Sequence, residues 1–325
     1  MRVFCKLIAL VVLTSLVAGC GQNGSAPSGG GKAKMTIALV TKSTSHDFWQ
    51  TVRAGAMQAG KENNVEVIFR GPAKETDVAG QMTIMEDFVN QKVDAIVMAA
   101  CNSKALVGTV QKAIKAGIPV VTIDSGIDTD DAASFVATDN IDGARKAADA
   151  LAKLIGEKGS IGVMPIVSGA ATSTMREDGF KEQIAKYKNI KVVATLFSQC
   201  DELRGMAATE DMLTAHPDIV GIFSACGPGA VGTARVLEQK KLAGKIKFVA
   251  FDAIPAEIDA FKRGTIQALV VQNPYKMGYE GVKTAIAVKQ GKKVEKRIDT
   301  GVAVVTKENF DKPETQKLLF PLKKD

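Results

Sequence analysis

One continuous stretch of the chain, Ala95–Asp124, decides the fold; its sequence is AIVMAACNSKALVGTVQKAIKAGIPVVTID. It opens with an apolar run of the kind that a strand buried on both faces of a parallel sheet requires. The amphipathic segment Ser103–Ala116 follows, with Ser103 as a candidate helix cap and Gly117-Ile118-Pro119 as a helix stop. A second apolar run ends at Asp124. Strand, helix and strand in this order predict a parallel βαβ unit.

The same alternation continues along the rest of the chain. We expect strands at the apolar runs Met35–Val40, Val65–Phe69, Ala95–Ala100, Pro119–Ile123, Ser160–Val167, Lys191–Phe197, Ile219–Ser224, Ile246–Phe251 and Ile266–Val271. We expect helices at Phe48–Glu62, Thr76–Asn90, Ser103–Ala116, Ile141–Ile155, Arg176–Tyr187, Leu203–Ala215, Ala230–Gln239 and Pro255–Lys262. The series restarts near Ser160, so the predicted fold class is α/β, with two doubly wound parallel-sheet lobes.

The N-terminus has the features of an export signal. Arg2 and Lys6 give a basic start, and the apolar run Leu7–Val17 is too short to span a bilayer as a mature helix. The run ends in Val-Ala-Gly-Cys, which resembles a bacterial lipobox, so we expect a signal peptide over residues 1–19 and lipidation of Cys20. The alternative is an ordinary signal peptide with an incidental cysteine. Residues 20–33 are rich in glycine and serine and predict a flexible tether.

Composition narrows the class of partner and cofactor. The net charge of +7 falls to +5 when Arg2 and Lys6 leave with the signal, and no basic stripe with interleaved aromatic residues suggests nucleic acid. Cys101, Cys200 and Cys226 would remain in an oxidising compartment. Because neither a C-x-x-C motif nor a histidine-rich spacing is present, we expect no metal. We also expect no cofactor.

Ligands of open parallel sheets bind at the carboxyl ends of the strands, so the residues there are the candidates for a site. His46, Phe48 and Trp49 follow the first predicted strand, and the two rings offer a flat apolar face. The alternative is that Phe48 packs inward and only Trp49 is exposed. Asp124 and Asp252 each end a strand, where a carboxylate can accept hydrogen bonds from vicinal hydroxyl groups. Capping of the next helix is the alternative for both aspartates.

Two further polar residues lie at comparable positions. Arg176 opens a predicted helix and could hold oxygen atoms with its planar guanidinium group. The alternative for Arg176 is a surface ion pair with Glu177 or Asp178. Gln272 closes a predicted strand and offers both a hydrogen-bond donor and an acceptor.

The segment Gly227–Gly232 matches the pattern G-x-G-x-x-G, with Asp252 at the spacing of a dinucleotide-binding fingerprint. Pro228 removes an N–H group that should face a phosphate. Nicotinamide cofactors are also not expected outside the membrane. We therefore interpret these glycines as parts of a tight strand-to-helix turn.

With these residues in hand, the chain closely resembles the periplasmic ribose-type (type I) sugar-binding proteins of ABC transporters, in a lipoprotein form. The resemblance covers about Lys34 to Pro321. It rests on Thr36-Ile37-Ala38-Leu39-Val40, Phe48-Trp49, Asp94-Ala95-Ile96-Val97, Asn102-Ser103-Lys104-Ala105-Leu106, Gly117–Asp124, Ala137-Thr138-Asp139-Asn140, Arg176-Glu177-Asp178-Gly179-Phe180, Thr214-Ala215-His216-Pro217-Asp218 and Val271-Gln272-Asn273-Pro274.

The resemblance implies two lobes joined by a three-strand hinge that close on one sugar. The N-terminal lobe would hold residues 34–138 and 273–299, and the C-terminal lobe residues 139–272 and 300–325. Family pocket positions fall on His46, Phe48, Trp49, Asp124, Arg176, Cys200, Cys226, Asp252 and Gln272. Several positions depart from the family: Ala99 and Cys226 replace asparagines, Cys200 replaces an aromatic residue, and Ser125 replaces an arginine. A monosaccharide other than ribose, or a polyol, is therefore expected.

The function that the resemblance implies is capture of this ligand for an ABC importer, with no chemistry on the ligand. We expect a monomer that works with a membrane permease in the periplasm or at the cell surface, anchored through Cys20. A sensor that presents its closed form to a receptor is the main alternative. A LacI-type repressor would need an N-terminal helix-turn-helix. A glycosidase would need an acid/base pair with a defined spacing.

Cys200 and Cys226 both follow strands of the second predicted lobe at pocket positions. We hypothesise that they lie close enough to form a disulfide at the floor of the pocket, in an oxidising compartment. The alternative is that the two cysteines are separate small apolar fillers. A Cα separation above roughly 7 Å would exclude the disulfide.

Overall fold

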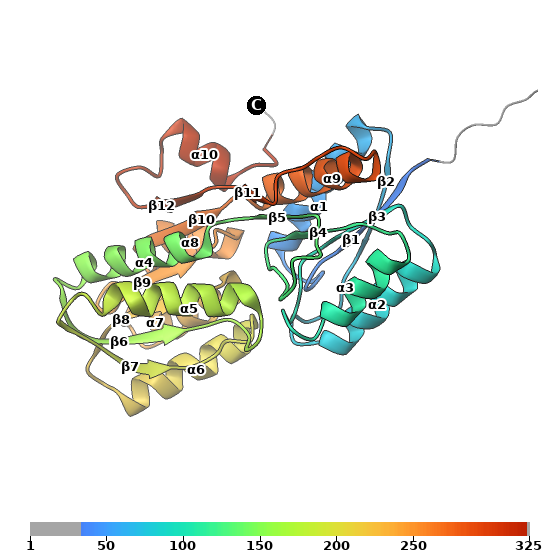
Figure 1. The fold of residues 1–325 in the computed structure, drawn as a ribbon. Coiled ribbons are helices and arrows are strands. Elements are labelled where there is room, and N and C mark those ends of the chain that lie inside the picture. Colours follow the sequence, from blue (N-terminus) through green and yellow to red (C-terminus); the bar gives the residue numbers. More distant parts are fainter. Residues whose placement is uncertain (1–33, 324–325) are drawn as a thin grey trace, which may run out of the picture. The chain divides into compact units, whose positions relative to one another are not determined.

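The computed structural model describes residues 34–323 (Figure 1). The expected signal peptide (1–19), Cys20, the tether (20–33) and the last two residues lie outside the described residues. Within residues 34–323, no helix combines the length and the apolar character that a membrane span requires.

Six strands form the first sheet, in the order β11-β5-β4-β3-β1-β2, and all neighbouring strands run parallel. The central strands β3 and β4 are buried along their whole length, because helices cover both faces of the sheet. The strands are β1 (Thr36–Val40), β2 (Glu66–Arg70), β3 (Ala95–Met98), β4 (Val120–Ile123), β5 (Ser134–Ala137) and β11 (Arg297–Asp299).

Six further strands form the second sheet, in the order β12-β10-β9-β8-β6-β7. Only β12 runs antiparallel to its neighbour, β10; the other neighbouring pairs are parallel. The strands are β6 (Lys158–Met164), β7 (Asn189–Thr195), β8 (Ile219–Ser224), β9 (Lys247–Phe251), β10 (Ala268–Gln272) and β12 (Val302–Val305). The predicted fold class, two doubly wound parallel sheets, is therefore present.

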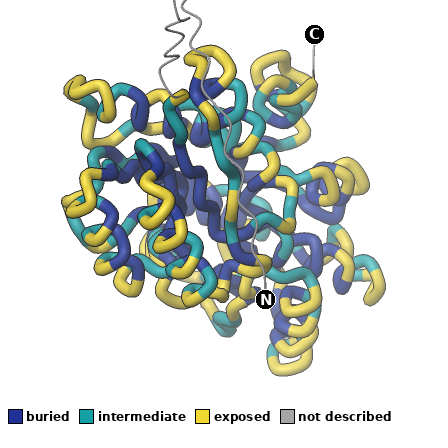
Figure 2. The backbone as a smooth tube through the Cα atoms, turned by 90° about the vertical axis from the view of Figure 1, so that its right-hand side faces the viewer, coloured by how far each residue is buried: buried dark blue, intermediate teal, exposed yellow. Residues whose placement is uncertain are grey.

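Helices cover both faces of each sheet, and alternate residues of every central strand enter the two cores. In the first lobe, α1 and α9 pack on one face and α2 and α3 on the other. In the second lobe, α4 and α5 share one core, and α6, α7, α8 and α10 share the other. Figure 2 shows the buried backbone in the interior and exposed helix surfaces outside. The helices are α1 (Asp47–Glu62), α2 (Val78–Asn90), α3 (Val107–Lys115), α4 (Asn140–Leu154), α5 (Ala171–Ile184), α6 (Glu202–Ala215), α7 (Gly227–Gln239), α8 (Pro255–Lys262), α9 (Pro274–Lys289) and α10 (Pro313–Leu319).

The chain passes between the two sheets three times, after β5, after β10 and after β11. Helix α9 brings the chain back to the first lobe, where it packs tightly against α1. A Cβ atom at Gly55 would lie 2.0 Å from the carbonyl oxygen of Tyr275, and one at Gly278 would lie 1.9 Å from that of Val52. Only glycine allows the two helix backbones to approach this closely.

Several elements differ from the sequence-based expectations. Helix α3 begins at Val107, and Asn102 rather than Ser103 accepts the N–H groups of the preceding turn. Helices α5 and α7 begin earlier than predicted, at Ala171 and Gly227. Strands β5, β11 and β12 and helices α9 and α10 were not predicted. The three strands have only three or four residues, and two glycines interrupt the helical pattern of α9.

Candidate functional site

The carboxyl ends of the two sheets enclose one small pocket between the lobes, which we call the cleft pocket. The space within it is about 240 Å³. It is lined by a first wall from the first lobe (Lys42, His46, Phe48, Trp49, Glu75 and Asp124) and a second wall from the second lobe (Ile166, Arg176, Cys200, Cys226, Asp252 and Gln272). The structure therefore brings together all nine residues that the sequence predicts for the site, and it adds Lys42, Glu75 and Ile166.

A buried ion network forms the base of the first wall. The Nζ atom of Lys42 lies 3.3 Å from Oε2 of Glu75 and 3.1 Å from Oδ2 of Asp124. The same ammonium group donates a hydrogen bond of 3.3 Å to the Thr172 hydroxyl of the second lobe. All three side chains of the ion network are at most 5% exposed. The ammonium group of Lys42 thus makes one hydrogen bond across the lobes and ion-pair contacts with two carboxylate oxygens of its own lobe.

The two carboxylates of this network respond differently to burial. Burial disfavours the charge of Lys42, but Asp124 and Glu75 outweigh it and raise the lysine pKa. Burial also disfavours ionised Glu75, yet Lys42 and His46 outweigh it and lower the pKa of Glu75 to about 2. The pKa of Asp124 is raised, because burial outweighs the attraction of Lys42 and Arg176. The firmly ionised pair in the first wall is therefore Lys42 with Glu75.

Phe48 and Trp49 lie in the first turn of α1 and form the apolar part of the first wall. Their rings meet edge to face with centroids 4.9 Å apart, and they are 7% and 1% exposed. The Nε1 group of Trp49 donates a hydrogen bond of 3.0 Å to Glu75. The alternative with only Trp49 exposed is wrong, since both rings are buried and both line the pocket.

His46 precedes α1 and also contacts Glu75. Its Nε2 atom lies 3.4 Å from Oε1 of Glu75, while its Nδ1 atom is buried without a hydrogen-bond partner. Burial opposes the charged imidazole, but the hydrogen bond to Glu75 and the charge of Glu75 outweigh it and raise the His46 pKa. The unpartnered Nδ1 atom is available to a polar ligand in the cleft pocket.

Arg176 is buried in the second wall at the start of α5. Its Nε group donates to Asn140 at 2.8 Å, and an Nη group donates to the carbonyl oxygen of Ala225 at 2.7 Å. Its guanidinium carbon lies 3.8 Å from the centre of the Phe251 ring. The alternative of a surface ion pair is therefore wrong, because the side chain is only 2% exposed. These contacts hold the guanidinium plane in one orientation at the pocket.

Asp252 and Gln272 end the adjacent strands β9 and β10. The carboxylate of Asp252 accepts hydrogen bonds from the backbone N–H of Gly227 at 3.0 Å and from Gln272 at 2.5 Å. The amide oxygen of Gln272 is buried without a partner. Neither Asp252 nor Asp124 caps the helix that follows it: Glu257 accepts the N–H of Ile254 before α8, and Asp139 caps α4.

Both strand-end aspartates adopt left-handed backbone conformations. The φ angle is 54° at Asp124 and 90° at Asp252. Such a conformation costs a non-glycine residue about 1–3 kcal/mol and is common where surrounding structure fixes a functional side chain. Both carboxylates line the cleft pocket, so the strained positions coincide with the candidate site.

Helix packing explains the glycines of Gly227–Gly232. A Cβ atom at Gly232 would lie 2.2 Å from the carbonyl oxygen of Glu202, and one at Gly229 would lie 2.6 Å from the Ser198 side chain. The N–H of Gly227 is already bound to Asp252. The glycines therefore allow α7 to approach α6 and the preceding loop, and the expected tight strand-to-helix turn is present.

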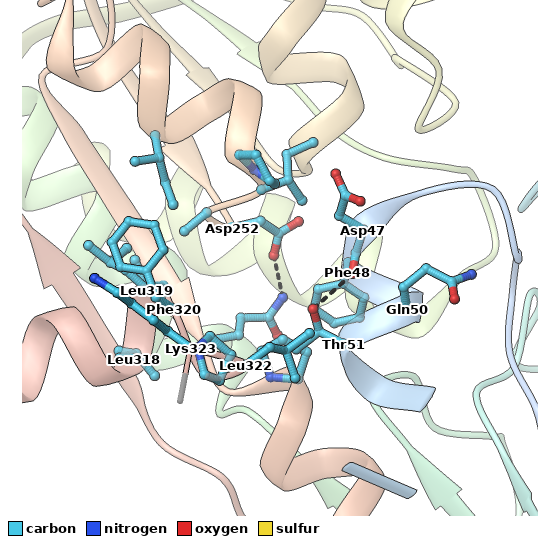
Figure 3. Close-up of a pocket in the computed structure, with 18 residues that line it drawn as sticks. Asp47, Phe48, Gln50, Thr51, Asp252, Leu318, Leu319, Phe320, Leu322 and Lys323 are labelled. Carbon is cyan, nitrogen blue, oxygen red and sulfur yellow. Dashed lines mark hydrogen bonds between the residues drawn. The ribbon is translucent and has the colours of Figure 1, made fainter. Parts of the chain in front are cut away.

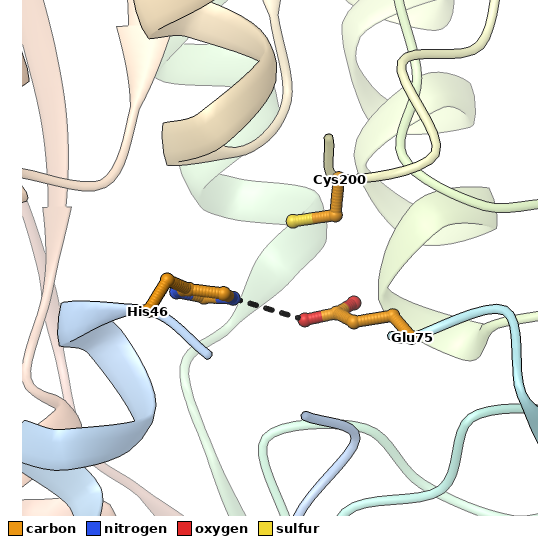
Figure 4. Close-up of side chains that lie close together, drawn as sticks. All are labelled: His46, Glu75 and Cys200. Carbon is orange, nitrogen blue, oxygen red and sulfur yellow. Dashed lines mark hydrogen bonds and ion pairs between the residues drawn. The ribbon is translucent and has the colours of Figure 1, made fainter. Parts of the chain in front are cut away.

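The two thiols of the second wall lie among these polar groups. Cys200 and Cys226 are free cysteines, and the Ser198 hydroxyl lies 3.5 Å from Sγ of Cys226. Donor atoms of His46, Glu75 and Cys200 all lie within 4.8 Å of one another (Figure 4). The ammonium group of Lys42 already neutralises Glu75 there. The positive charge that a metal ion would bring to this carboxylate is therefore supplied by the protein's own lysine.

The two lobes contact each other beside the cleft pocket. The hydrogen bond from Lys42 to Thr172 joins the loop after β1 of the first lobe to α5 of the second. The N–H of Ser103 donates to the carbonyl oxygen of Gly169 at 2.9 Å. A Cβ atom at Gly169 would lie 2.3 Å from Nδ2 of Asn102, so the lobes approach closely here.

A larger hollow adjoins the cleft pocket and shares Phe48, Asp252 and Gln272 with it (Figure 3). Its volume is about 1000 Å³, and residues 318–323 after β12 form one side. Most of its lining is apolar, whereas the charged groups of both lobes converge on the cleft pocket. We therefore assign the site to the smaller cavity, where polar groups can fix the orientation of a small ligand.

The rule that ligands bind at the carboxyl ends of strands could have found Lys42, which lies two residues after the end of β1. A lysine near a helix start is usually solvated, however, and its burial here depends on carboxylates from distant segments. Glu75 lies in the loop after β2, and no local pattern marks it. Ile166 was assigned to a predicted strand, but it lies just beyond β6.

Two α/β lobes that share one polar pocket at their strand ends define a two-lobed solute-binding protein. The chain belongs to the periplasmic binding protein domain family, which matches residues 37–293. The resemblance to periplasmic sugar-binding proteins of ABC transporters that we inferred from the sequence is thereby confirmed, and the lipoprotein form stays a prediction.

Individual relatives are similar over nearly the whole chain. A D-ribose/D-allose-binding protein of Pseudomonas aeruginosa is 32% identical and covers 93% of this chain and 97% of its own. A carbohydrate transporter solute-binding protein of Agrobacterium radiobacter, solved with D-arabinose, is 39% identical with a TM-score of 0.86 and covers 89% of this chain and 99% of its own. An ABC transporter solute-binding protein of Agrobacterium vitis, solved with D-fucose, is 41% identical with a TM-score of 0.85 and covers 87% and 99%.

Proposed function

We propose that this protein captures a monosaccharide or a related polyol in the cleft pocket and delivers it to an ABC importer. The observation that carries the proposal is the set of hydrogen-bonding groups that converge on this pocket from both lobes. Asp252 and the free amide oxygen of Gln272 can accept hydrogen bonds from hydroxyl groups, and the free Nδ1 of His46 donates to a hydroxyl oxygen when the imidazole is charged and accepts from a hydroxyl group when it is neutral. The sugars in the names and bound states of the relatives support the same ligand class.

The remaining lining residues have separate roles in this proposal. Phe48 and Trp49 pack against the apolar face of the ring. Arg176 donates hydrogen bonds to ring or hydroxyl oxygens, and Asp124 bonds a hydroxyl group beside Lys42. Cys200 and Cys226 complete the wall as weakly polar neighbours. Because these groups are already held by protein contacts, little side-chain entropy is lost when the ligand binds.

Binding acts through closure of the lobes and requires no chemistry on the ligand. Only the closed state offers a sugar the contacts of both walls, so the ligand stabilises closure by its differential affinity. A membrane permease would then distinguish closed from open protein. We propose a non-enzymatic monomer with lobes over 34–138 plus 273–299 and 139–272 plus 300–325; the strands of each sheet fall within these ranges.

The proposed location is outside the cytoplasmic membrane, with residues 1–19 as the signal peptide, Cys20 as the lipid anchor and residues 20–33 as the tether. The sequence Val-Ala-Gly-Cys at residues 17–20 supports this arrangement. Mass spectrometry of the protein from bacterial membranes tests it. A Cys20→Ser variant should lose the lipid mass and be released from the membrane fraction.

Calorimetric titration with a panel of pentoses, hexoses, 6-deoxy sugars and polyols tests the function. At least one should bind, and Asp252→Asn should weaken its binding by about 1.5–3 kcal/mol, since a charge-assisted bond is lost. The exposed Asp259→Asn on α8 is the matched control and should leave the affinity unchanged. Equal affinities of the two variants would contradict the proposed site.

A further inference from the structure

Cys200 and Cys226 meet in the second wall although they belong to different strand-to-helix loops. One hydroxyl group, that of Ser198, lies 3.4 Å from the backbone nitrogen of Cys200 and 3.5 Å from Sγ of Cys226. Both side chains line the cleft pocket, and Cys200 packs against the core cluster that contains Cys226. Each thiol also shifts the pKa of the other, which shows that the two groups interact. Two sulfur atoms in this relation are placed to react with each other.

We propose that Cys200 and Cys226 are an oxidative modification site, where an external disulfide oxidant converts the two thiols into a disulfide in the wall of the cleft pocket. Formation of the bond follows from the position of the thiols alone. Its effect on ligand binding rests on the proposed function.

The two thiols differ in access. Cys226 is 3% exposed and lines the cleft pocket. Cys200 is half-buried and also lines a separate hollow of about 700 Å³, formed by residues 43, 45, 73–76, 199–201 and 204. A small oxidant can therefore reach Cys200 from this second side, and Cys226 follows as the resolving thiol.

The surroundings of Cys226 suit a resolving thiol. It occupies the N-cap position of α7, where the helix dipole favours a thiolate. Burial opposes its ionisation, but hydrogen bonds from Cys200, Ser198 and the N–H of Gly229 outweigh burial and lower its pKa. The pKa of Cys200 is raised by its hydrogen bond to Cys226 and by burial. The first step should therefore accelerate as the pH rises.

The reaction is two successive thiol–disulfide exchanges. The thiolate of Cys200 attacks one sulfur of the oxidant, forms a mixed disulfide and releases the first oxidant thiol. The thiolate of Cys226 then attacks Sγ of Cys200, forms the protein disulfide and releases the second thiol. Two protein thiols lose two electrons, the oxidant disulfide gains them, and the two protons end on the released thiols.

The loop that carries Cys200 is already fixed in place. Gln199 and Cys200 have left-handed φ angles of 55° and 51°, and the N–H of Gln199 donates to the carbonyl oxygen of Ile166 at 2.8 Å. This anchoring keeps the Cys200 sulfur beside Cys226 and raises the effective concentration for ring closure. Oxidation removes two S–H groups from the wall of the cleft pocket, so we expect several-fold weaker sugar binding.

Thiol counting and peptide mapping test the proposal. The full-length protein is treated with oxidised glutathione near neutral pH, then denatured and digested. We expect the loss of two free thiols and a peptide that links Cys200 to Cys226. The matched control Cys101→Ser should form the same bond, because Cys101 lies in the first lobe.

The variants distinguish the internal bond from other oxidation. Cys226→Ser should accumulate glutathione on Cys200, and Cys200→Ser should form no internal bond. Two results would overturn the proposal. One is that the protein without substitutions keeps both thiols after treatment; the other is that it carries stable glutathione on Cys200 although Cys226 is present. Calorimetry on the reduced protein tests sugar binding without any oxidant. A protein that forms the disulfide but binds no sugar when reduced would contradict only the sugar-binding function.

Discussion

The two walls of the cleft pocket occupy equivalent strand ends but satisfy their charges in different ways. The first wall is compensated internally, because Lys42 bridges Glu75 and Asp124 and the three side chains are buried together. In the second wall, Arg176 donates to a backbone carbonyl oxygen in the loop before α7, and Asp252 accepts from the first backbone N–H group of α7. The amide oxygen of Gln272 in that wall has no partner.

This difference predicts that the two walls contribute differently to folding stability and to ligand affinity. Removing one member of a self-compensated buried network leaves a charge without its partner, so the first wall should dominate folding stability. Backbone-held groups with a free acceptor are pre-arranged for a ligand, so the second wall should dominate affinity.

The largest expected effect comes from Lys42→Met. The variant leaves Glu75 and Asp124 buried without their cation, so the free energy of unfolding should fall by about 3–5 kcal/mol. Urea denaturation at neutral pH measures it. The control Lys112→Met breaks an exposed ion pair with Glu86 and should cost less than about 1 kcal/mol. Equal losses of unfolding free energy in the two variants would contradict the idea that the first wall dominates folding stability.

A buried carboxyl group on the second lobe gives the next largest effect. Glu257 is fully buried, one of its oxygens has no hydrogen-bond partner, and no cation pairs with it among the described residues. Burial and the charge of Asp252 raise its pKa well above the ordinary value, opposite to the shift of Glu75. A raised carboxyl pKa favours the folded protein below pH 4.5, and this contribution is lost as the pH rises through the folded pKa.

Glu257→Gln should therefore raise the free energy of unfolding on the order of 1–3 kcal/mol at pH 8 and by less at pH 5. Chemical denaturation at the two pH values measures the difference. Glu66→Gln is the control, since Glu66 is exposed on β2. The depressed pKa of Glu75, about 2, has the opposite sign: its stabilisation is present above pH 4.5 and is lost as the pH falls toward 2. A uniform gain at both pH values would contradict the assigned pKa shift of Glu257.

The sequence predicted the parts of the fold and of the pocket that depend on local patterns. Continuous apolar runs marked the buried central strands, and the strand-end rule marked Asp124, Asp252 and Gln272. Strands β11 and β12 escaped prediction because three or four residues carry too little pattern, and their pairing partners lie far away in the chain.

The charge network could not be predicted in the same way. Lys42, Glu75 and Asp124 come from three separate segments, and only the folded sheet brings them within ion-pair distance. The partners of Arg176 are similarly distant, which is why a surface ion pair with its sequence neighbours was a reasonable alternative. Sequence patterns therefore located these positions, whereas the partners depend on tertiary structure.

The smallest expected effect tests the hydrogen bond by which Lys42 of the first wall links the two lobes. Thr172→Val removes the hydroxyl that accepts from Lys42 across the lobes, but Lys42 keeps both carboxylates of the first wall. We expect sugar affinity to fall by about 0.5–1.5 kcal/mol, the net value of one hydrogen bond, with a smaller change in unfolding free energy. Calorimetry and denaturation provide the two numbers, and the exposed Thr174→Val on the same helix is the control. A loss of stability as large as that of Lys42→Met would show that the first wall depends on the second lobe for its compensation.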